Sequence, residues 1–330
     1  MNACSLMKRS GSAARRAGAL VPLSLALSAA LLSAPSPALG EDAAKLYVHI
    51  ETPGRFSYSG DPTQVSILFK NEGTAAWVNP GLDIEAGFQV FDSDGNKLER
   101  AKVPAASKEG QPKILEANAY FGKIVNLNEH FPKISGIGTY RITWSAAGIP
   151  EQTLATRIIR KYDPSKEYQA VIDTDFGKIV IDFYKDLAPF HTRNFIDLVN
   201  LDFYNGLLFH RIVKGESIFG GSPTADERGS PGYNVSPEPN GLKVLPGVVA
   251  QVRNSQTGAE ESGSIFMIAA TAQPDMDGRV TVFARVVEGL DTVKTIANVP
   301  TVGSAPRSAS RPIKDVAIKK VEIREKKTKS

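Results

Sequence analysis

The sequence predicts a β-dominated protein in which an antiparallel β-sandwich precedes a closed antiparallel β-barrel with two helical caps. Short runs rich in β-forming residues, such as residues 46–50 and 65–69, are separated by glycine, proline and asparagine clusters. Two stretches in the second half, beginning near Pro189 and Glu288, instead have apolar residues at helical spacing. The length of 330 residues allows about two domains.

The first forty residues have the pattern of a secretory signal. Its basic residues come first, at Lys8, Arg9, Arg15 and Arg16. An apolar run over residues 20–32 follows, and the small residues at 38–40 provide a cleavage site. The run is shorter than the roughly 20 residues that a transmembrane helix needs. We therefore expect export to a periplasm or to the outside of the cell, with no stable membrane anchor after cleavage.

Loss of the signal removes the net charge and the cysteine of the chain. The whole chain has 39 Lys and Arg against 35 Asp and Glu, and all four charges of the signal are basic, so 35 of each remain. A chain without net charge does not indicate nucleic acid as a partner. Cys4 leaves with the signal, which excludes disulfides and cysteine metal sites from the mature protein.

Composition divides the chain into five parts. These are a signal peptide, a β-sandwich domain, a linker, a barrel domain and a basic tail, at residues 1–40, 41–162, 163–167, 168–325 and 326–330. The linker is predicted from Asp163-Pro164, because a residue before proline is biased away from helix.

The first domain has the pattern of a sandwich and shows no chemistry. Residues 140–144 alternate apolar and polar side chains, as in a strand with one buried face. Trp77 and Trp144 are expected in the core. His49 and His130 have no partner at metal-ligand spacing and are expected at the surface or in turns. The domain resembles immunoglobulin-like modules of secreted bacterial proteins in architecture alone, so a binding or spacing role is predicted.

The second domain is predicted to begin with a hairpin over residues 171–184 and to continue with the helix from Pro189. Its last strand is expected over residues 316–323. The apolar pattern of that strand shifts by one residue after Lys319-Lys320, which indicates a β-bulge or an exit from the sheet. Many antiparallel strands with two isolated helices describe a closed barrel with helical caps.

An arginine stands at the centre of this second domain. The turn at Asn205-Gly206 leads into an apolar run at residues 207–209, and Arg211 and Gly220-Gly221 follow. Glycine allows positive φ or the close approach of another chain. An arginine at a strand end beside a glycine-rich groove presents a fixed fork of donors to a cavity. On these residues alone, an ion-paired surface arginine is the better interpretation.

The second domain resembles the cyclophilins, the peptidyl-prolyl cis–trans isomerase family. The stretches that carry the resemblance stand in family order, at residues 206–211, 220–223, 231–233, 247–249, 263–268, 276–278 and 282–290. The resemblance implies an eight-stranded barrel capped by two helices, without a cofactor or a metal. It also implies that the partners are proline-containing polypeptides.

Isomerisation of an Xaa–Pro bond requires no nucleophile, because the barrier of about 18–20 kcal/mol comes from amide resonance. An apolar floor must hold the proline ring, and a guanidinium can donate to the nitrogen lone pair that appears when the amide twists. The resemblance places Arg211 in this catalytic role. It implies substrate contacts from Phe219, Arg253, Phe266, Met267, Met276 and Val280. For Arg253 the alternative is a solvated arginine in a loop, which is the better interpretation of that residue alone.

The predicted pocket departs from the family pattern. Where the family usually has an aromatic residue, two glutamines, a large aromatic and a histidine, this chain has Glu216, Phe219, Ile265, Asp275 and Val280. The Glu216 carboxylate is expected to pair with Arg211 and to compete for its donors. Met267 and Met276 would keep the floor apolar.

Three functions follow from these observations. We predict isomerisation of Xaa–Pro bonds in exported proteins. The alternative is a barrel with weak or lost catalysis that binds peptides as an adaptor. A third possibility makes the sandwich the functional part and the barrel its packing partner.

Overall fold

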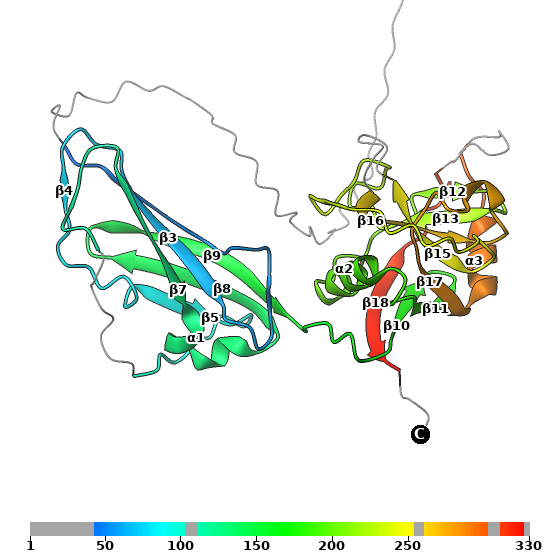
Figure 1. The fold of residues 1–330 in the computed structure, drawn as a ribbon, viewed down its shortest axis with the longest axis horizontal. Helices are drawn as coiled ribbons and strands as arrows, with labels where there is room; N and C mark the ends of the chain where they lie inside the picture. The colour runs from blue at the N-terminus through cyan, green and yellow to red at the C-terminus, as the bar shows by residue number, and fades with distance from the viewer. Residues whose placement is uncertain (1–42, 103–110, 254–260, 303–310, 327–330) are drawn as a thin grey trace, which may run out of the picture. The chain divides into compact units, whose positions relative to one another are not determined.

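The computed structural model describes residues 43–102, 111–253, 261–302 and 311–326 (Figure 1). Within these ranges the chain forms eighteen strands and three α-helices, so the prediction of a β-dominated protein is confirmed. The predicted signal peptide lies outside the described residues. No helix within the described ranges is long and apolar enough to cross a membrane.

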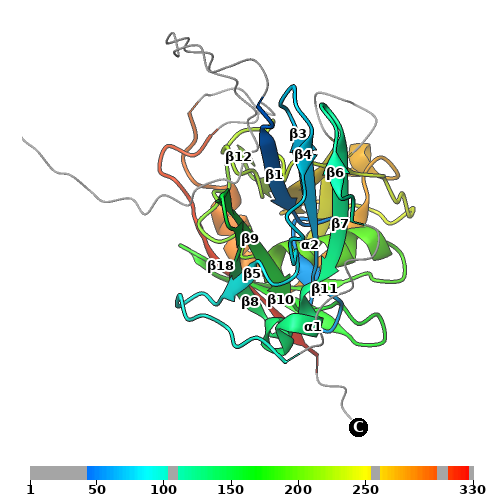
Figure 2. The ribbon, with the colours of Figure 1, turned by 90° about the vertical axis from the view of Figure 1, so that its left-hand side faces the viewer.

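The first half forms three sheets around one hydrophobic cluster. The three-stranded sheet has the order β1 (Leu46–Glu51), β3 (Gln64–Asn71), β7 (Tyr120–Asn126), and Figure 2 shows these strands side by side. The four-stranded sheet has the order β2 (Ser57–Tyr58), β9 (Ile149–Ile159), β8 (Gly138–Ala146), β5 (Phe88–Phe91). The remaining elements are the pair β4 (Trp77–Val78) and β6 (Ile114–Leu115), helix α1 (Leu127–His130) and the 3-10 turn Pro132–Ser135.

Alternation with period two positions these strands. In β3 the side chains of Val65, Ile67 and Phe69 are buried, and their neighbours on the other face are partly exposed. Trp144 is fully buried and its Nε1 donates to the Ile84 carbonyl at 2.7 Å, which confirms the predicted core position. Trp77 is partly buried and packs against the edge of the same cluster.

Two expectations for this half are wrong. The sandwich is not antiparallel throughout, because the two-residue strand β2 docks on the edge of β9 after a loop and pairs with it in parallel. His130 is buried rather than superficial, because its Nε2 lies 3.0 Å from the Glu85 carboxylate, which takes the place of water as its partner. His49 is exposed, as expected. The immunoglobulin-like topology stays a prediction.

The second half forms one curled antiparallel sheet. Its strands are β10 (Tyr168–Thr174), β11 (Gly177–Phe183), β12 (Arg211–Val213), β13 (Ser217–Gly220), β14 (Asn234–Val235), β15 (Val248–Arg253), β16 (Glu261–Ala269), β17 (Val282–Glu288) and β18 (Ile318–Glu325). Eight of them follow the path β12-β13-β16-β15-β17-β11-β10-β18, and β14 pairs with β16 beside this path. The number of strands on the path agrees with the prediction.

The two ends of the sheet meet without a continuous ladder, which corrects the expectation of a closed barrel. Strands β12 and β18 are not neighbours in the strand order. Instead, Leu208 forms isolated bridges with both Ser222 and Ala317. The Phe209 amide donates to the Val316 carbonyl at 2.9 Å, and the Ile318 amide donates to the Leu207 carbonyl at 2.8 Å. The segment just before Arg211 therefore joins the two ends.

The predicted bulge and helices are confirmed. The register of β18 on β10 shifts between Asp173, which faces Lys320, and Thr174, which faces Ile318, so Lys319 is the extra residue. The helices are α2 (Pro189–Asn200) and α3 (Leu290–Ala297). Each buries one apolar stripe, with Phe195, Leu198 and Val199 in α2 and Val293, Ile296 and Ala297 in α3.

Replacing Gly289 with alanine is expected to destabilise the second domain by about 1–3 kcal/mol. Gly289 has φ of 87° at the start of α3, and an added Cβ would lie 2.1 Å from the Lys178 carbonyl oxygen. Urea unfolding measures the effect. Gly278→Ala is the matched control, since Gly278 has φ of 67° but open space around it, and it should cost less. Equal losses in the two variants would show that the close approach is unimportant.

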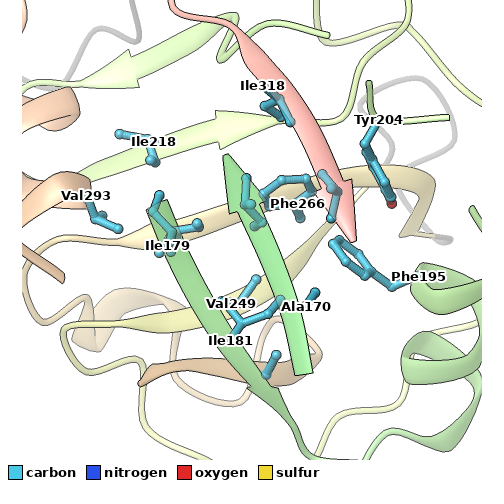
Figure 3. Packing of buried hydrophobic residues seen from close by; sticks show 14 of the residues in the cluster. Ala170, Ile179, Ile181, Phe195, Tyr204, Ile218, Val249, Phe266, Val293 and Ile318 are labelled. Carbon is cyan, nitrogen blue, oxygen red and sulfur yellow. The ribbon is translucent and has the colours of Figure 1, made fainter. Parts of the chain in front are cut away.

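The main core of this half is formed by side chains from the sheet, α2 and α3 (Figure 3). Phe195 of α2 stacks on Tyr204 with 4.8 Å between ring centroids and meets Phe266 of β16 edge-on at 5.6 Å. Successive residues of a strand face opposite sides. Since Phe266 faces this core, Met267 faces away from it, toward a second cluster that underlies the candidate site.

Candidate functional site

Arg211 is positioned by the turn and the short strand that surround it. Gly206 adopts φ of 81° in the turn, and the chain then crosses between the two ends of the sheet before β12 begins at Arg211. Strand β12 pairs with β13, where Phe219 is the direct partner of Arg211. The guanidinium carbon of Arg211 lies 4.5 Å from the centroid of the Phe219 ring, a cation–π contact. The structure thus places two of the predicted site residues in contact.

An apolar cluster lies beneath the guanidinium. Phe219 of β13 is the register partner of Met267 in β16, and both are buried. Met276 and Val280 are partly buried and pack against this cluster. The structure therefore brings together four of the predicted substrate contacts, and Met276 and Val280 are the two with solvent-accessible edges. Such a surface has the chemistry to hold a proline ring.

The other two predicted contacts are placed differently. Phe266 is fully buried and faces the main core (Figure 3). It lies on the opposite side of β16 from Met267, which belongs to the second cluster. This position does not fit the predicted contact with substrate. Arg253 ends β15, and its side chain lies outside the described part of the structure. Its role stays a prediction.

The ion-pair partner of Arg211 is Glu227. The Arg211 Nη1 lies 2.9 Å from the Glu227 Oε1, with side-chain exposures of 30% and 52%. The expected partner, Glu216, forms no ion pair with Arg211 among the described residues, which corrects that expectation. Its backbone carbonyl accepts from the Ala270 amide at 2.8 Å, so Glu216 lies in the turn between β12 and β13, beside the end of β16. A carboxylate does pair with Arg211, but it belongs to Glu227 rather than to Glu216.

Glu227 lies in a turn that is held by hydrogen bonds to the Asp226 carboxylate. The Asp226 carboxylate accepts from the Thr224 hydroxyl at 2.8 Å and from the amides of Arg228 at 2.8 Å and Gly229 at 3.1 Å. These hydrogen bonds, the one from Thr224 first, lower the pKa of Asp226 to about 2, and so it is ionised at any ordinary pH. Sequence reasoning missed Glu227. The adjacent acids at 226 and 227, after the paired glycines, were the signal that could have drawn attention to it.

A buried acid–histidine cluster lies behind the site. His191 Nδ1 lies 2.5 Å from Glu238 Oε2, and His191 Nε2 lies 2.7 Å from Glu261 Oε2. Glu238 also accepts the amides of Phe190 and His191 at the start of α2. Glu261 Oε1 accepts the Thr281 amide at 3.1 Å, next to Val280 of the apolar cluster. Nothing in the sequence spacing indicated this cluster.

The cluster predicts a pH dependence of stability. Burial lowers the pKa of His191, but the contacts with Glu261 and Glu238 outweigh burial and raise the pKa above its usual range. A raised folded pKa stabilises the fold below the unfolded value of about 6.5. That stabilisation is lost as the pH rises through the folded pKa. We expect the free energy of unfolding of wild type, relative to His191→Gln, to fall over this window.

Urea unfolding of both proteins at a series of pH values measures this difference. The comparison with His191→Gln is needed because burial lowers the pKa of His210. This shift makes the free energy of unfolding rise with pH in both proteins, so the difference between them isolates His191. A difference that stays constant across the window would contradict the prediction.

A further cavity lies away from the predicted site residues, and no metal site is found in the described ranges. A cavity of about 590 Å³ is lined by residues that include Val171, Val180 and Ile323, and it contains none of the predicted site residues. Within the described ranges, no group of His, Cys, Asp and Glu has the arrangement of a metal site.

Comparisons with known proteins match the second half of the chain. A family model for the cyclophilin type peptidyl-prolyl cis-trans isomerase/CLD matches residues 170–323. The chain is 31% identical over 157 residues to peptidyl-prolyl cis-trans isomerase CYP18-2 of Arabidopsis thaliana, covering 47% of this chain and 93% of that protein. It is 34% identical over 132 residues to a peptidyl-prolyl cis-trans isomerase of Synechococcus elongatus, covering 39% and 89%.

A solved structure also matches this half. It is the crystal structure of a cyclophilin type peptidyl-prolyl cis-trans isomerase of Cryptosporidium parvum in the presence of the dipeptide Ala-Pro. The sequence identity is 26% and the TM-score is 0.43, and the match covers 47% of this chain and 98% of that one.

Proposed function

The chain belongs to the cyclophilin-type peptidyl-prolyl cis–trans isomerase family, and from this premise we propose that it isomerises Xaa–Pro bonds in exported polypeptides, with Arg211 as the catalytic residue. One observation carries the proposal. A partly exposed guanidinium is held against an apolar cluster whose rim, at Met276 and Val280, is open to a proline ring. The family members that it resembles are enzymes of this class.

Isomerisation requires mainly these two features of the site, a guanidinium donor and an apolar surface. Rotation about the imide localises the nitrogen lone pair, and a donor at that nitrogen stabilises the twisted state alone. A guanidinium has five N–H donors in a fixed fork. Because Glu227 lies against Nη1 and Nε is buried, the Nη2 donors of Arg211 are the ones available for the prolyl nitrogen.

The same geometry favours a second candidate, a peptide-binding adaptor with weak catalysis. The Arg211–Glu227 ion pair engages part of the catalytic group before any substrate arrives. Phe219 and Ile265 replace side chains that could have donated hydrogen bonds to the substrate backbone, and both are buried apolar residues. Peptides would then be held by the apolar rim without rapid turnover.

Export of the protein is also part of the proposal. The basic residues, apolar run and small-residue site at 1–40 support it. The clients would be polypeptides that fold beyond the cytoplasmic membrane.

A proline-limited refolding assay on the mature chain from Glu41 tests the proposed enzyme. Acceleration by wild type that is lost in Arg211→Ala supports catalysis at this residue. If wild type, the variant and buffer give one rate while wild type still binds a proline peptide, the adaptor is the function.

A further inference from the structure

The ion pair between Arg211 and Glu227 bears directly on the proposed reaction. Glu227 contacts the catalytic guanidinium directly, through the 2.9 Å distance between Nη1 and Oε1. Two opposite consequences are possible for such a contact. A carboxylate can withdraw the donors from the substrate, or it can hold the guanidinium in the orientation that catalysis needs.

The contacts of Arg211 favour the second consequence. One face of its guanidinium lies against the Phe219 ring, and one edge lies against Glu227. Its Nε is buried and has no hydrogen-bond partner among the described residues. The Phe219 contact is an attraction of the cation to the ring face, and it provides no hydrogen bond that would fix how the guanidinium is rotated over the ring. Among the described residues, Glu227 is therefore the contact that fixes the rotation.

The turn that carries Glu227 is built to hold it in place. Asp226 is fixed by the Thr224 hydroxyl and by two backbone amides. The turn begins at Ser222, which is buried and bridges to Leu208 in the segment that leads to Arg211. Both partners of the ion pair are thus anchored to the same bridge. An ordinary surface pair between flexible side chains lacks such anchoring and contributes little.

We propose that Glu227 is a positioning residue for the isomerase, which orients the Arg211 guanidinium so that its free donors face the prolyl nitrogen. This inference rests on the proposed function of Arg211. The N–H groups on the edge that pairs with Glu227 no longer donate to substrate, and the remaining N–H groups of the guanidinium gain a fixed direction. A misplaced catalytic group can lose up to about 100-fold in rate, because orientation supplies much of the catalytic effect. A guanidinium that stays in the site but rotates is expected to lose less than this.

The test compares Glu227→Gln with Glu216→Gln in the mature chain, using a peptide with one Xaa–Pro bond. Each substitution removes one carboxylate, and of the two residues only Glu227 contacts Arg211 among the described ion pairs. Glu227→Gln is expected to lower kcat about tenfold with KM within twofold, and Glu227→Asp to restore part of the loss. Glu216→Gln should leave both constants unchanged. An unchanged or increased kcat in Glu227→Gln would overturn the proposal.

A second readout does not depend on activity. The Arg211 Nε–H signal in a nitrogen-15 NMR spectrum should be a single sharp resonance in wild type and in Glu216→Gln. It should broaden in Glu227→Gln as the guanidinium begins to rotate. If wild type shows no isomerase activity but the signal changes as expected, the proposed function fails and the positioning contact stands. An identical signal in all three proteins would overturn the contact itself.

Discussion

Replacing Arg211 with alanine is expected to lower kcat/KM for an Xaa–Pro peptide by about 100-fold, or about 2.7 kcal/mol of transition-state stabilisation. The guanidinium is a charged donor beside the apolar cluster. In the proposed mechanism it interacts with the prolyl nitrogen only when the imide is twisted. Loss of such an interaction lowers kcat and leaves substrate binding nearly unchanged. Exchange spectroscopy on a peptide with one proline measures both quantities.

Arg211→Lys tests whether charge alone is sufficient. Lysine keeps the charge but lacks the planar fork, and its ammonium cannot both pair with Glu227 and lie flat on Phe219. We expect a loss close to that of alanine. Arg228→Ala serves as the control, because this arginine is on the same turn with a side chain that is 73% exposed and pairs with Asp226 instead. A wild-type rate in Arg211→Ala would remove this residue from the mechanism.

Replacing Glu261 with alanine is expected to lower the free energy of unfolding by about 3–5 kcal/mol. Glu261 is 1% exposed, and its two carboxylate oxygens lie against His191 and the Thr281 amide. The substitution leaves a buried imidazole with one partner and a buried amide with none. Urea unfolding measures the loss. Glu322→Ala is the control, since its pair with Lys320 is exposed and should contribute little to stability.

His191→Gln in the Glu261→Ala background separates the two causes of that loss. If the unpaired histidine is the main cost, the double variant should recover part of the stability. A double variant with the summed loss of the two single variants would place the cost on the Thr281 amide and the cavity instead. A loss below about 1 kcal/mol in Glu261→Ala itself would contradict the prediction.

The elements that depend on local periodicity could be predicted from the sequence. The stripe of Phe195, Leu198 and Val199 indicated α2, and the one-residue shift after Lys319-Lys320 indicated the bulge in β18. Both signals are local, because burial of one face requires apolar residues at fixed spacing along a few turns or one strand. The family resemblance added Arg211, and the structure places it against Phe219.

One error could have been avoided from the sequence. Phe266 and Met267 are adjacent in a strand, so their side chains face opposite sides of the sheet and cannot both line one pocket. Assigning Met267 to the site therefore assigns Phe266 to the core, as the structure has it. The alternation of side chains between the two faces of a strand gives this information without any knowledge of the fold.

Other features depend on contacts between distant residues. Glu216 is closer to Arg211 in the sequence, yet the turn fixed by Asp226 brings Glu227 to the guanidinium. His191, Glu238 and Glu261 come from a helix, a loop and a strand, and no spacing rule joins them. The parallel pairing of β2 with β9 likewise depends on where a loop returns. Such contacts follow from the path of the chain rather than from the composition of any one segment.

The isolated bridges at Leu208 have a consequence for how the protein loses activity on heating. Strand β12 has a ladder on one side only, and a few hydrogen bonds join its approach to β18. Local opening requires the least free energy where such contacts are few. The edge of the sheet with the fewest contacts thus carries Arg211, the proposed catalytic residue. We therefore expect isomerase activity to be lost at temperatures where the phenylalanine core is still intact.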